Sequence, residues 1–571
     1  MQKRWVIKET PEEERVRELA ESINVNPHLA TLLYQRKIST YEQAEQFFCP
    51  ALTQLHDPFL MLNMGRAVER LTQAIGDEEK IMIYGDYDVD GTTSVALVFG
   101  FLQHYSSHLI YYIPDRYDEG YGVSEQGIRY AAEAGVSLII TLDCGIKALN
   151  TIGLAGKLGV DVIVCDHHLP GEDLPPAYAV LDPKQADCPY PYKELSGCGV
   201  GFKLLHAWCL QNSIPEQELF AHLDLLAVSI AADIVPLTGE NRVLSHFGLK
   251  VLARTKNTGL RALIQTASIK VPLSIRDVVF RIAPRINAAG RVSHGRNAVA
   301  LLLTDDEEEA ISMAKAINEN NTSRKEFDST ITKEALELIE SDVLLKGARS
   351  TVLFKHDWHK GVIGIVASRC IEKYHRPTII LTESNSMATG SARSIPGFDI
   401  YEAISSCSEY LEQYGGHTHA AGLTLKIENV EAFASRFEEV ASNLVHEELL
   451  TPPMDIDLEI PLERISPKFF SILKRMAPFG PQNMVPVFAS RGVSLASRPR
   501  IIKGKHLVLL LKRTDLPPIE AIAWNMAPLA PSLERGPFDL AYTIEENEYR
   551  GNKTLRLCVE DIQFHTNLTH T

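Results

Sequence analysis

The stretch IMIYGDYDVDGTTS, residues 81–94, decides the fold of this chain. It begins with an uninterrupted apolar run, residues 81–84, of the kind found in strands that are covered on both faces of a sheet. The acidic residues from Asp86 to Asp90 stand where such a strand would end. Ligands of open parallel sheets bind outside the carboxyl ends of the strands. The stretch therefore predicts a buried parallel strand with a polar site at its end.

The same arrangement, an apolar run followed by acids or histidines, recurs further along the chain. The places are residues 137–142 before Asp143, residues 161–165 before Asp166, His167 and His168, and residues 177–181 before Asp182. Helix-like stretches separate these runs, which is typical of strands in a parallel sheet. Asp182 precedes a proline, so we expect it to begin a turn. The other strand ends are predicted to meet in one cleft.

That cleft is predicted to hold metal ions. Asp88 and Asp90 can both face one ion, with Gly91 relieving the turn and a helix beginning directly after it. Asp143 and one or both histidines would arrive from neighbouring strands, and the acid before the histidines would orient an imidazole. Carboxylate and imidazole without thiolate favour manganese or magnesium over structural zinc. So many carboxylates would repel one another without cations, and the ligands suffice for two ions roughly 3.5–4 Å apart.

Composition predicts a cytoplasmic globular protein. The chain has 571 residues, which is enough for several domains. Of these residues, 45% are hydrophobic and 23% are charged. Its nine cysteines include no CxxC pair, which favours reduced thiols over disulfides or a zinc site. The first residues lack the apolar core of a signal peptide, and no stretch approaches a membrane span. The formal charge of −16 argues weakly against a nucleic-acid partner, but local basic surface decides that question better.

The pattern of apolar runs and turns divides the chain into five parts. They are a mostly helical segment at 1–64, an α/β domain with the parallel sheet at 65–250, a connecting region at 251–349, a second α/β unit at 350–450, and a region of short strands at 455–565. Pro/Gly turns between the short strands suggest a small β-barrel. The expected fold class is thus α/β and multi-domain, with a β-barrel in the last part.

Residues 305–342 are predicted to form one long helix in the connecting region. Thr304 is the expected N-cap, acids crowd the first turn, and apolar residues recur at helical spacing. At 1.5 Å per residue the helix would be roughly 55 Å long, enough to tie two domains together.

Four segments resemble the motifs of the DHH phosphoesterase superfamily: GDYDVDGTTS, LDCG, CDHH and AADIVPL. The likeness is in particular to RecJ-type single-stranded-DNA exonucleases. It continues through PRINAAGR (284–291), WHKGVIGIVASR (358–369), GSARSI (390–395) and GGHTHAAG (415–422), and so covers nearly the whole chain. The resemblance implies a DHH domain, a DHH-associated second α/β domain that binds substrate, and an OB-like barrel that binds nucleic acid.

The resemblance also implies which residues face the metal ions. They are Asp88, Asp90, Asp143, His167, His168 and Asp233. Asp233, in AADIVPL, comes from the resemblance alone. Asp86 matches an acidic position of the first motif, as a ligand or as a proton handler, and we expect catalytic roles for Asp86 and His168. The implied activity is 5′-to-3′ degradation of single-stranded DNA into mononucleotides by two-metal hydrolysis, in recombination and repair.

Two segments carry basic residues without acids and could follow a phosphate backbone. Residues 281–296 hold Arg281, Arg285, Arg291 and Arg296, and residues 498–513 hold Arg498, Arg500, Lys503, Lys505, Lys512 and Arg513. For the first segment, pairing with the acidic cleft is an alternative for one or two arginines. For the second, the alternative is a solvated basic face. Arg285 and Arg291 are the members that we predict to bind substrate.

The loop IPDRYDEGYG, residues 113–122, follows a predicted strand and precedes a predicted helix. Arg116 and the helix N-terminus would suit a phosphate. Tyr117 or Tyr121 could stack on a base, and Tyr121 is the one that we select.

The second α/β unit contributes three further predicted contacts to substrate. In GSARSI, Ser391 and Arg393 alternate onto one side of an extended segment and could clasp a terminal phosphate bidentately. Similarity to the family supports that role, and spacing alone would not. His417 lies in a glycine-rich turn where the backbone can approach a ligand closely.

Two other functions remain open at this point. A phosphodiesterase for short oligonucleotides or cyclic dinucleotides would use the same chemistry, but so small a substrate needs neither the C-terminal strands nor their basic residues. A non-catalytic DNA-binding scaffold would not need the intact carboxylates. Single-stranded DNA is the expected partner and a membrane is not. The sequence leaves open whether a single-strand-binding protein or a helicase cooperates.

Overall fold

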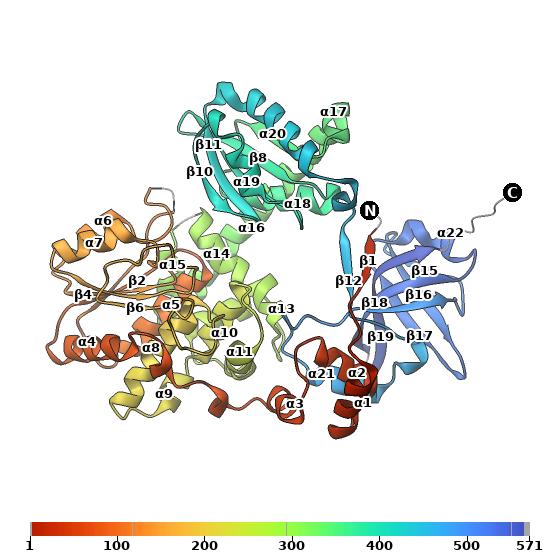
Figure 1. Cartoon of the computed structure of the whole chain (residues 1–571), viewed down its shortest axis with the longest axis horizontal. Coiled ribbons are helices and arrows are strands. Elements are labelled where there is room, and N and C mark those ends of the chain that lie inside the picture. The colour runs from red at the N-terminus through yellow and green to blue at the C-terminus, as the bar shows by residue number, and fades with distance from the viewer. Residues whose placement is uncertain (1–2, 117, 293, 550, 565–571) are drawn as a thin grey trace.

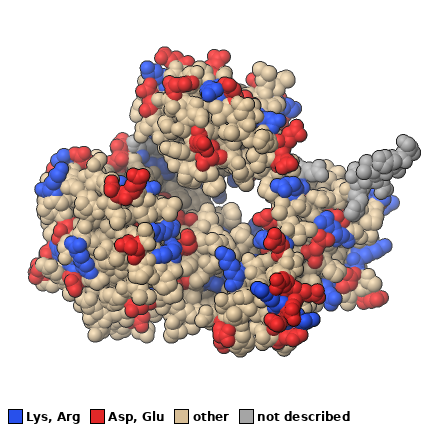
Figure 2. Space-filling model, viewed as in Figure 1, with Lys and Arg blue, Asp and Glu red and all other residues tan. Residues whose placement is uncertain are grey.

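The computed structural model describes residues 3–116, 118–292, 294–549 and 551–564. Three lobes surround a central opening, which the space-filling view shows (Figure 2). In the cartoon the first α/β domain lies at the left, the second at the top and the C-terminal sheet at the right (Figure 1). The N-terminal helices lie at the bottom, between the first domain and the C-terminal sheet.

The first sheet consists of parallel strands in the order β3-β2-β4-β5-β6. The strands are Ile81–Gly85 (β2), Leu109–Tyr112 (β3), Leu138–Leu142 (β4), Asp161–Cys165 (β5) and Ala179–Leu181 (β6). Strands β2, β4, β5 and β6 coincide with the apolar runs of the sequence, so the predicted parallel sheet is confirmed. Strands β2 and β4 are buried throughout, because helices cover both faces of the sheet.

The register of this sheet aligns the ends of its strands. The last paired residues of the neighbouring strands β2, β4, β5 and β6 are Gly85, Leu142, Cys165 and Leu181. The residues that follow them are all acidic: Asp86, Asp143, Asp166 and Asp182. Equal strand ends therefore place these carboxyl groups along one edge of the sheet, where parallel sheets bind ligands.

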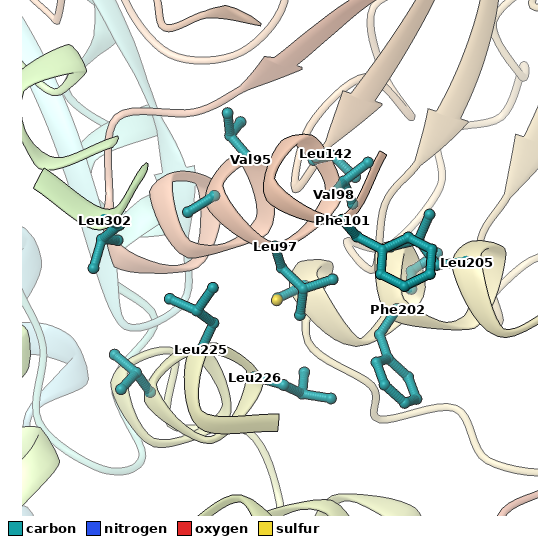
Figure 3. Close-up of a cluster of buried hydrophobic side chains, with 14 of the residues drawn as sticks. Val95, Leu97, Val98, Phe101, Leu142, Phe202, Leu205, Leu225, Leu226 and Leu302 are labelled. Carbon is teal, nitrogen blue, oxygen red and sulfur yellow. The ribbon is translucent and has the colours of Figure 1, made fainter. Parts of the chain in front are cut away.

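Helix α5, Val89–Leu102, is the centre of the first core (Figure 3). Every residue of the helix except Phe99 is buried, because apolar groups cover it on all sides. The covering elements include β4 and the helices Gly197–Gln211 (α8), Leu223–Ala232 (α10) and Arg296–Leu303 (α15). The core thus fixes α5, and with it the acidic segment that begins the helix.

The start of α5 differs from the prediction. The helix begins at Val89, before Gly91 and not after it, and Asp88 caps it by accepting a hydrogen bond from the Gly91 N–H at 3.0 Å. Asp90 therefore lies in the first helical turn. Gly91 is required by a close approach, since a Cβ there would lie 2.4 Å from the carbonyl oxygen of Asp86.

The predicted long helix is confirmed as α16, Glu307–Ser341. Its 35 residues span about 52 Å at 1.5 Å per residue. The predicted N-cap was wrong, because Asp306 lies closer to the free N–H groups and accepts from the Glu309 N–H at 2.8 Å. Thr304 instead ends α15 and donates to the Glu309 carboxylate at 2.6 Å.

Helix α16 belongs to two cores. Its first turns bury Ala310, Ala314 and Ile317 in the core of the first domain. Its last turns bury Ile331 and Ala335 against the second domain, near helix α18, Ile363–Tyr374. The helix therefore joins the two domains through buried contacts at each end.

The second sheet has the order β10-β11-β9-β8-β7. Its strands are Thr351–Lys355 (β7), Thr378–Ser384 (β8), Met387–Arg393 (β9), Leu411–His417 (β10) and Ala420–Leu425 (β11). Only β7 and β8 pair in parallel. Helix α20, Val430–Leu444, buries its phenylalanines in the core of this domain.

The C-terminal sheet has the order β13-β14-β18-β19-β17-β16-β15. Its strands are Leu458–Glu459 (β13), Phe488–Val493 (β14), Arg500–Ile502 (β15), His506–Arg513 (β16), Leu516–Ala523 (β17), Phe538–Tyr549 (β18) and Asn552–Phe564 (β19). Most neighbours are antiparallel, and helix α21, Pro467–Arg475, packs into the same core.

The N-terminal segment packs on this C-terminal sheet. Its helices are Glu13–Ser22 (α1), Pro27–Tyr34 (α2) and Tyr41–Phe48 (α3), and α1 to α3 contribute to the core of the sheet. A short strand that the sequence did not reveal, Arg4–Ile7 (β1), pairs in parallel with Pro453–Ile456 (β12). Four residues are too few to show an apolar period, and their partner is far away in the chain.

The other helices complete the layers around these sheets. They are Met64–Gly76 (α4), Glu125–Glu133 (α6), Leu149–Lys157 (α7), Glu216–Phe220 (α9), Gly239–Leu252 (α11), Thr258–Thr266 (α12), Ile275–Asp277 (α13), Ala283–Val292 (α14), Val343–Gly347 (α17), Ile400–Ser405 (α19) and Ala530–Leu533 (α22). Within the described ranges, none of the helices combines the length and the apolar character needed to cross a bilayer.

Candidate metal centre and substrate site

The imidazole of His167, directly after β5, is the meeting point of the predicted acids. Its Nε2 atom lies 3.2 Å from Asp143 Oδ1, 3.6 Å from Asp233 Oδ2 and 3.9 Å from Asp90 Oδ2. Asp143 follows β4, Asp233 follows α10, and Asp90 lies in the first turn of α5. The structure therefore brings together four predicted metal-facing residues from four separate segments.

Asp90 is anchored by helix α8. Its carboxylate accepts hydrogen bonds from the N–H groups of Gly197 at 2.6 Å and Cys198 at 2.9 Å, and from the Ser229 hydroxyl at 2.6 Å. The N–H groups at a helix N-terminus favour an anion. Sequence reasoning missed these anchors, although the capping serine Ser196 in SGCG was a signal for a helix start.

The second histidine, His168, is oriented by Asp166, as expected. Asp166 Oδ1 lies 2.7 Å from His168 Nδ1, and Asp166 Oδ2 accepts from the Ile146 N–H at 2.9 Å. Burial opposes ionisation of Asp166, but hydrogen bonding to His168 outweighs it and lowers the pKa of Asp166 to about 2. This contact fixes the ring and leaves His168 Nε2 facing Tyr121, whose hydroxyl lies 3.2 Å away.

The backbone of Asp143 is held in the left-handed region, with φ of 59°. Asp and Asn tolerate this conformation better than most other residues. The turn presses Asp143 against α8, since a Cβ on Gly197 would lie 2.5 Å from the Asp143 Cβ. Strain of this kind persists where the surroundings fix a residue, and here it accompanies a carboxylate that faces the cluster.

Burial and mutual repulsion raise the pKa of the clustered carboxyl groups. Burial and then Asp88 raise the pKa of Asp86 to about 8, and burial and then Asp90 raise the pKa of Asp233 to about 9. Burial and then Asp90 also raise the pKa of Asp143 well above its usual value. These groups would hold protons near neutral pH unless cations replaced the protons.

The donor set fits divalent cations. Two groups have all their ligand atoms within 4.8 Å of one another: Asp143 with His167 and His168, and Asp90 with His167 and Asp233. Among the described residues, neither ring nitrogen of His167 makes a hydrogen bond, and Asp233 Oδ2 makes none either. Buried polar atoms normally have partners, so these atoms are suited to a ligand. Carboxylate oxygens and imidazole nitrogens match manganese and magnesium.

Asp86 and Asp88 lie beside these two groups but are not members of them. Asp86 is fully buried at the end of β2, and Asp88 is engaged as the cap of α5. Burial and then the neighbouring Asp90 raise the pKa of Asp88, so its carboxylate belongs to the same electrostatic cluster. The metal-facing role of Asp88 and the catalytic role of Asp86 stay predictions.

The loop between β3 and α6 reaches the same site. Tyr121 is 56% exposed, and its ring centre lies 6.0 Å from that of His168 and 6.2 Å from that of Tyr87. The guanidinium of Arg116 lies 5.0 Å from the centre of the Tyr87 ring. Tyr121 thus contacts His168 of the metal-facing cluster directly, and Arg116 is linked to it through Tyr87 and Tyr121. Tyr117 lies outside the described residues.

Arginines of the first basic segment have partners within the protein. Arg281 donates to the carbonyls of Ala267 at 2.6 Å and Ser268 at 3.0 Å. The guanidinium of Arg296 lies 5.6 Å from the centre of the Tyr111 ring. Arg281 is therefore tied to the protein itself, but its partners are these carbonyls and the Asp277 carboxylate, 3.7 Å from its Nη1, and not the acidic cleft.

Arg285 of α14 faces the long helix α16, where Asn318 Oδ1 accepts from its Nε at 3.0 Å. Burial and then the charges of Arg285 and Arg324 lower the pKa of Lys325 on the same helix. These cations therefore lie close together. Acidic neighbours in the chain concealed Arg324 and Lys325 from sequence reasoning. The side chain of Arg291, also in α14, lies outside the described residues.

Ser391 and Arg393 lie on the same side of β9, as predicted. Arg393 Nη1 donates to Ser391 Oγ at 2.9 Å, and a Cβ on Gly364 in the first turn of α18 would lie 2.9 Å from Ser391 Oγ and from Arg393 Nη2. Across the sheet, Ala420 is paired with both Arg393 and His417. The three predicted residues thus share one end of the sheet, with two of them beside a helix N-terminus that favours phosphate.

The second basic segment, residues 498–513, does not form one continuous strip. Arg500 and Arg513 line a cavity of about 1390 Å³ beside α21, whereas Arg498 lines a separate hollow. The segment is split because it forms the hairpin of β15 and β16, which reverses direction. The large cavity also has charged residues from other elements: Lys474, Arg475, Lys553, Glu520 and Glu546.

Comparisons with known proteins agree with this architecture. Residues 80–230 match the DHH family, N-terminal domain, residues 347–443 match the DHHA1 domain, and residues 456–561 match the RecJ OB domain. The single-stranded-DNA-specific exonuclease RecJ of Bacillus subtilis (strain 168) is 39% identical over 562 residues, covering 98% of this chain and 70% of that protein. This chain belongs to the RecJ family. The resemblance found in the motifs and the predicted fold class, including the OB domain, are thereby confirmed.

Other RecJ proteins extend the match. RecJ of Dickeya dadantii (strain 3937) is 33% identical over 561 residues, covering 94% of this chain and 96% of that protein. The crystal structure of RecJ in complex with Mn2+ from Thermus thermophilus has a TM-score of 0.85 at 28% identity, covering 98% of this chain and 79% of that one. Shared architecture therefore extends through all three lobes.

Proposed function

We propose that this RecJ-family chain degrades single-stranded DNA from the 5′ end to mononucleotides, by metal-dependent phosphodiester hydrolysis, in DNA recombination and repair. The observation that carries the proposal is the convergence of Asp90, Asp143 and Asp233 on one imidazole, within 3.9 Å. The relatives support the substrate, since those from Bacillus subtilis and Dickeya dadantii are named single-stranded-DNA-specific exonucleases. Thermus thermophilus RecJ structures contain Mn2+ or Mg2+.

The residues that would hold two manganese or magnesium ions are Asp88, Asp90, Asp143, His167, His168 and Asp233. Bound divalent cations supply an activated water nucleophile and stabilise negative charge on the phosphoryl oxygens. The protein contributes rigid geometry. Three hydrogen bonds fix the Asp90 carboxylate, and Asp166 fixes the His168 ring, so these groups need little rearrangement when substrate binds.

Two groups are placed to handle protons. Asp86 is buried beside the cluster, and burial and then the charge of Asp88 raise its pKa, which suits its carboxyl group to accept a proton. His168 is 44% exposed and presents Nε2 to the Tyr121 hydroxyl at the mouth of the site. We assign proton transfer to Asp86 from inside the cluster and, while its Nε2 is not bound to an ion, to His168 from the exposed edge.

The second domain would hold the terminal phosphate. Ser391 and Arg393 present a hydroxyl and a guanidinium beside the start of α18, and His417 lies in the same row of the sheet. On the first domain, Arg116 and Tyr121 would contact the strand near the cluster, and Arg285 would contact it where α14 passes α16. Arg291 stays a predicted contact from the sequence. A strand held in this way would lie between the two domains.

The structure weighs against the two alternatives. A phosphodiesterase of very short substrates has no use for the basic cavity of the C-terminal lobe or for the OB domain match. A non-catalytic scaffold would not need buried carboxylates with raised pKa values, which cost stability in the absence of a ligand. The metal-dependent exonuclease uses both regions.

The proposal is tested by digestion of single strands labelled at the 5′ or the 3′ end, with manganese present. We expect early release of labelled mononucleotide from 5′-labelled strands only, and no release from a blunt duplex of the same sequence. Early release from the 3′ label would overturn the direction. Hydrolysis of dinucleotides but not of long strands would favour the short-substrate alternative.

Partners beyond single-stranded DNA form a separate part of the proposal. We infer that a single-strand-binding protein or a helicase prepares the strand, because the relatives are named single-stranded-DNA-specific exonucleases and a duplex would first have to be opened. Adding either protein to a partly duplex substrate should increase nucleotide release. We also place the activity in the cytoplasm, where the unpaired cysteines of the chain would stay reduced.

A further inference from the structure

The metal-facing cluster opens to solvent on one side. The side chains of Asp90 and Asp143 are 1% and 3% exposed, whereas those of Asp233 and His168 are 24% and 44% exposed. The mouth of the site is therefore formed by Asp233, at the end of α10, and by His168, after β5. Tyr121, which is 56% exposed, lies beside His168 at the same mouth.

An exposed aliphatic residue directly follows each of the two residues at the mouth. Leu169 follows His168 and is 70% exposed, and Ile234 follows Asp233 and is 63% exposed. Single exposed aliphatic residues are common on protein surfaces. Here, however, both are adjacent in sequence to residues that form the opening of a polar, catalytic cluster.

The backbone of Ile234 makes this residue more unusual. Its φ is 61°, and it is the only β-branched residue with positive φ in the part of the chain that the structure describes. A β-branched side chain in this conformation is strained, because its Cβ substituents crowd the backbone. Glycine or asparagine would make the same turn at lower cost.

The neighbours of Ile234 force the turn. On one side, the Asp233 N–H donates to the Ser229 carbonyl and ends α10. On the other, the Pro236 carbonyl accepts from the Tyr192 hydroxyl and the Asn241 side chain, each at 3.1 Å. The chain is thus fixed before and after Ile234, and this maintains the strained conformation.

Neither folding nor packing explains isoleucine at this position. The side chain is mostly exposed, so it contributes little to the core, and its conformation is unfavourable. The residue that is best for stability would be glycine or asparagine. An apolar side chain on an unfavourable backbone conformation at the mouth of a site is consistent with a contact made in the substrate complex.

We propose that Ile234 and Leu169 form an apolar lip that contacts the base of the terminal nucleotide while its phosphate lies at the metal-facing cluster. This inference rests on the proposed exonuclease function. Aliphatic side chains make van der Waals contact with the face of any base but form no hydrogen bonds with base edges. The lip therefore supports removal of all four nucleotides and gives no preference among them.

The test compares Ile234→Asn and Leu169→Ser with the wild-type chain on two single strands. One strand begins with an ordinary nucleotide and the other with an abasic nucleotide that retains its sugar and phosphate. Each variant should lower kcat/KM on the ordinary strand about five- to tenfold, equally for the four bases, and leave the abasic strand unaffected. Ile234→Val, which keeps an aliphatic side chain, should retain most of the activity.

Glu78→Asn is the matched control for the backbone. Glu78 is exposed, has φ of 55° and lies after α4, remote from the cluster. Both Asn substitutions should maintain or raise Tm, and only Ile234→Asn should lower activity.

Two outcomes would overturn the lip. Equal losses on the ordinary and abasic strands would show that Ile234 acts through the position of Asp233, and unchanged activity on both would show no role. A wild-type chain that cannot digest single strands would instead remove the proposed function and this inference with it.

Discussion

The metal-facing cluster of the first domain and the proposed phosphate clasp of the second, Ser391 with Arg393, are built in opposite ways. The cluster collects acids from separate segments and buries them, so that burial raises the pKa values of Asp86, Asp143 and Asp233. The clasp takes Ser391 and Arg393 from neighbouring positions of one strand, where simple alternation brings them together. One site depends on the whole fold, and the other depends on local geometry.

This difference predicts how the two sites fail. The cluster is a set of mutually dependent charges, so the loss of one member disturbs the others and the chemistry stops. The proposed clasp would contribute binding contacts only, so its loss should weaken substrate binding and leave the chemistry intact. The expected effects therefore decrease from the cluster to the clasp and then to the more distant cations.

Removal of metal should have the largest effect. Dialysis against a chelator is expected to reduce nucleotide release to background, and manganese should restore it. The carboxyl group of Asp233, with a pKa of about 9, holds a proton that the metal must displace, so the apparent manganese affinity should fall as pH decreases from 9 to 7. Calorimetric titrations at the two pH values measure this change.

Stability provides a second readout of metal binding. The raised pKa of Asp233 means that ionisation destabilises the metal-free fold as pH rises from the unfolded value towards about 9. A hundredfold excess of manganese over Kd should stabilise the chain by about 2.7 kcal/mol. An unchanged Tm on addition of manganese at pH 8.5 would contradict a metal site in the cluster.

Asp143→Asn should reduce kcat roughly a thousandfold while DNA binding persists. Asparagine tolerates the left-handed backbone of Asp143, so the fold should be retained and only the charge removed. Asp515→Asn is the matched control, since Asp515 has φ of 55° in an exposed turn of the C-terminal sheet. Similar kcat values for the two variants would refute the central role of the cluster.

Arg393→Lys should raise KM about tenfold for strands with a 5′ phosphate and leave kcat nearly unchanged. Lysine keeps the charge but cannot reproduce the bidentate geometry of the guanidinium. Strands with a 5′ hydroxyl should show a smaller effect. Arg436→Lys, whose side chain is 38% exposed on helix α20 of the same domain, serves as the control. A loss in kcat alone would argue that Arg393 serves the chemistry and not the hold on substrate.

Lys325→Gln should have the smallest effect, a loss in affinity of a few fold at low salt. Lys325 lies near Arg285 and Arg324, where a phosphate would relieve the repulsion among the cations. Removal of one phosphate contact should reduce the slope of log affinity against log salt by about 0.7. Lys333→Gln, further along α16 and well exposed, should leave the slope unchanged.

The sequence predicted what local patterns and strand ends encode. The apolar runs placed β2, β4 and β5, and the parallel arrangement placed Asp143 and His167 at one edge. The capping residues of α5 and α16 were less predictable, because several acids or hydroxyls near a helix start compete for the same N–H groups. Only the resemblance to the family identified Asp233, since it follows a helix and not a strand.

Long-range contacts were beyond prediction from the sequence. The anchoring of Asp90 by α8 depends on how two helices cross in the core, and no periodicity records such a crossing. The same is true of β1, whose partner β12 lies at the other end of the chain. In the basic segments, the sequence showed where the positive charges are but not what each side chain binds. Arg281, for example, donates to backbone carbonyls.

The pairing of β1 with β12 has a topological consequence. The polypeptide leaves the C-terminal lobe through the N-terminal helices, passes through both α/β domains and returns along β12, so that the lobes are linked in a circuit around the central opening (Figure 1). A strand that ran through this opening could be released only by sliding along its own length past one of its ends, or by separation of β1 from β12. A covalently closed circle of DNA has no end that could enter such an opening, so it would not be bound in this way.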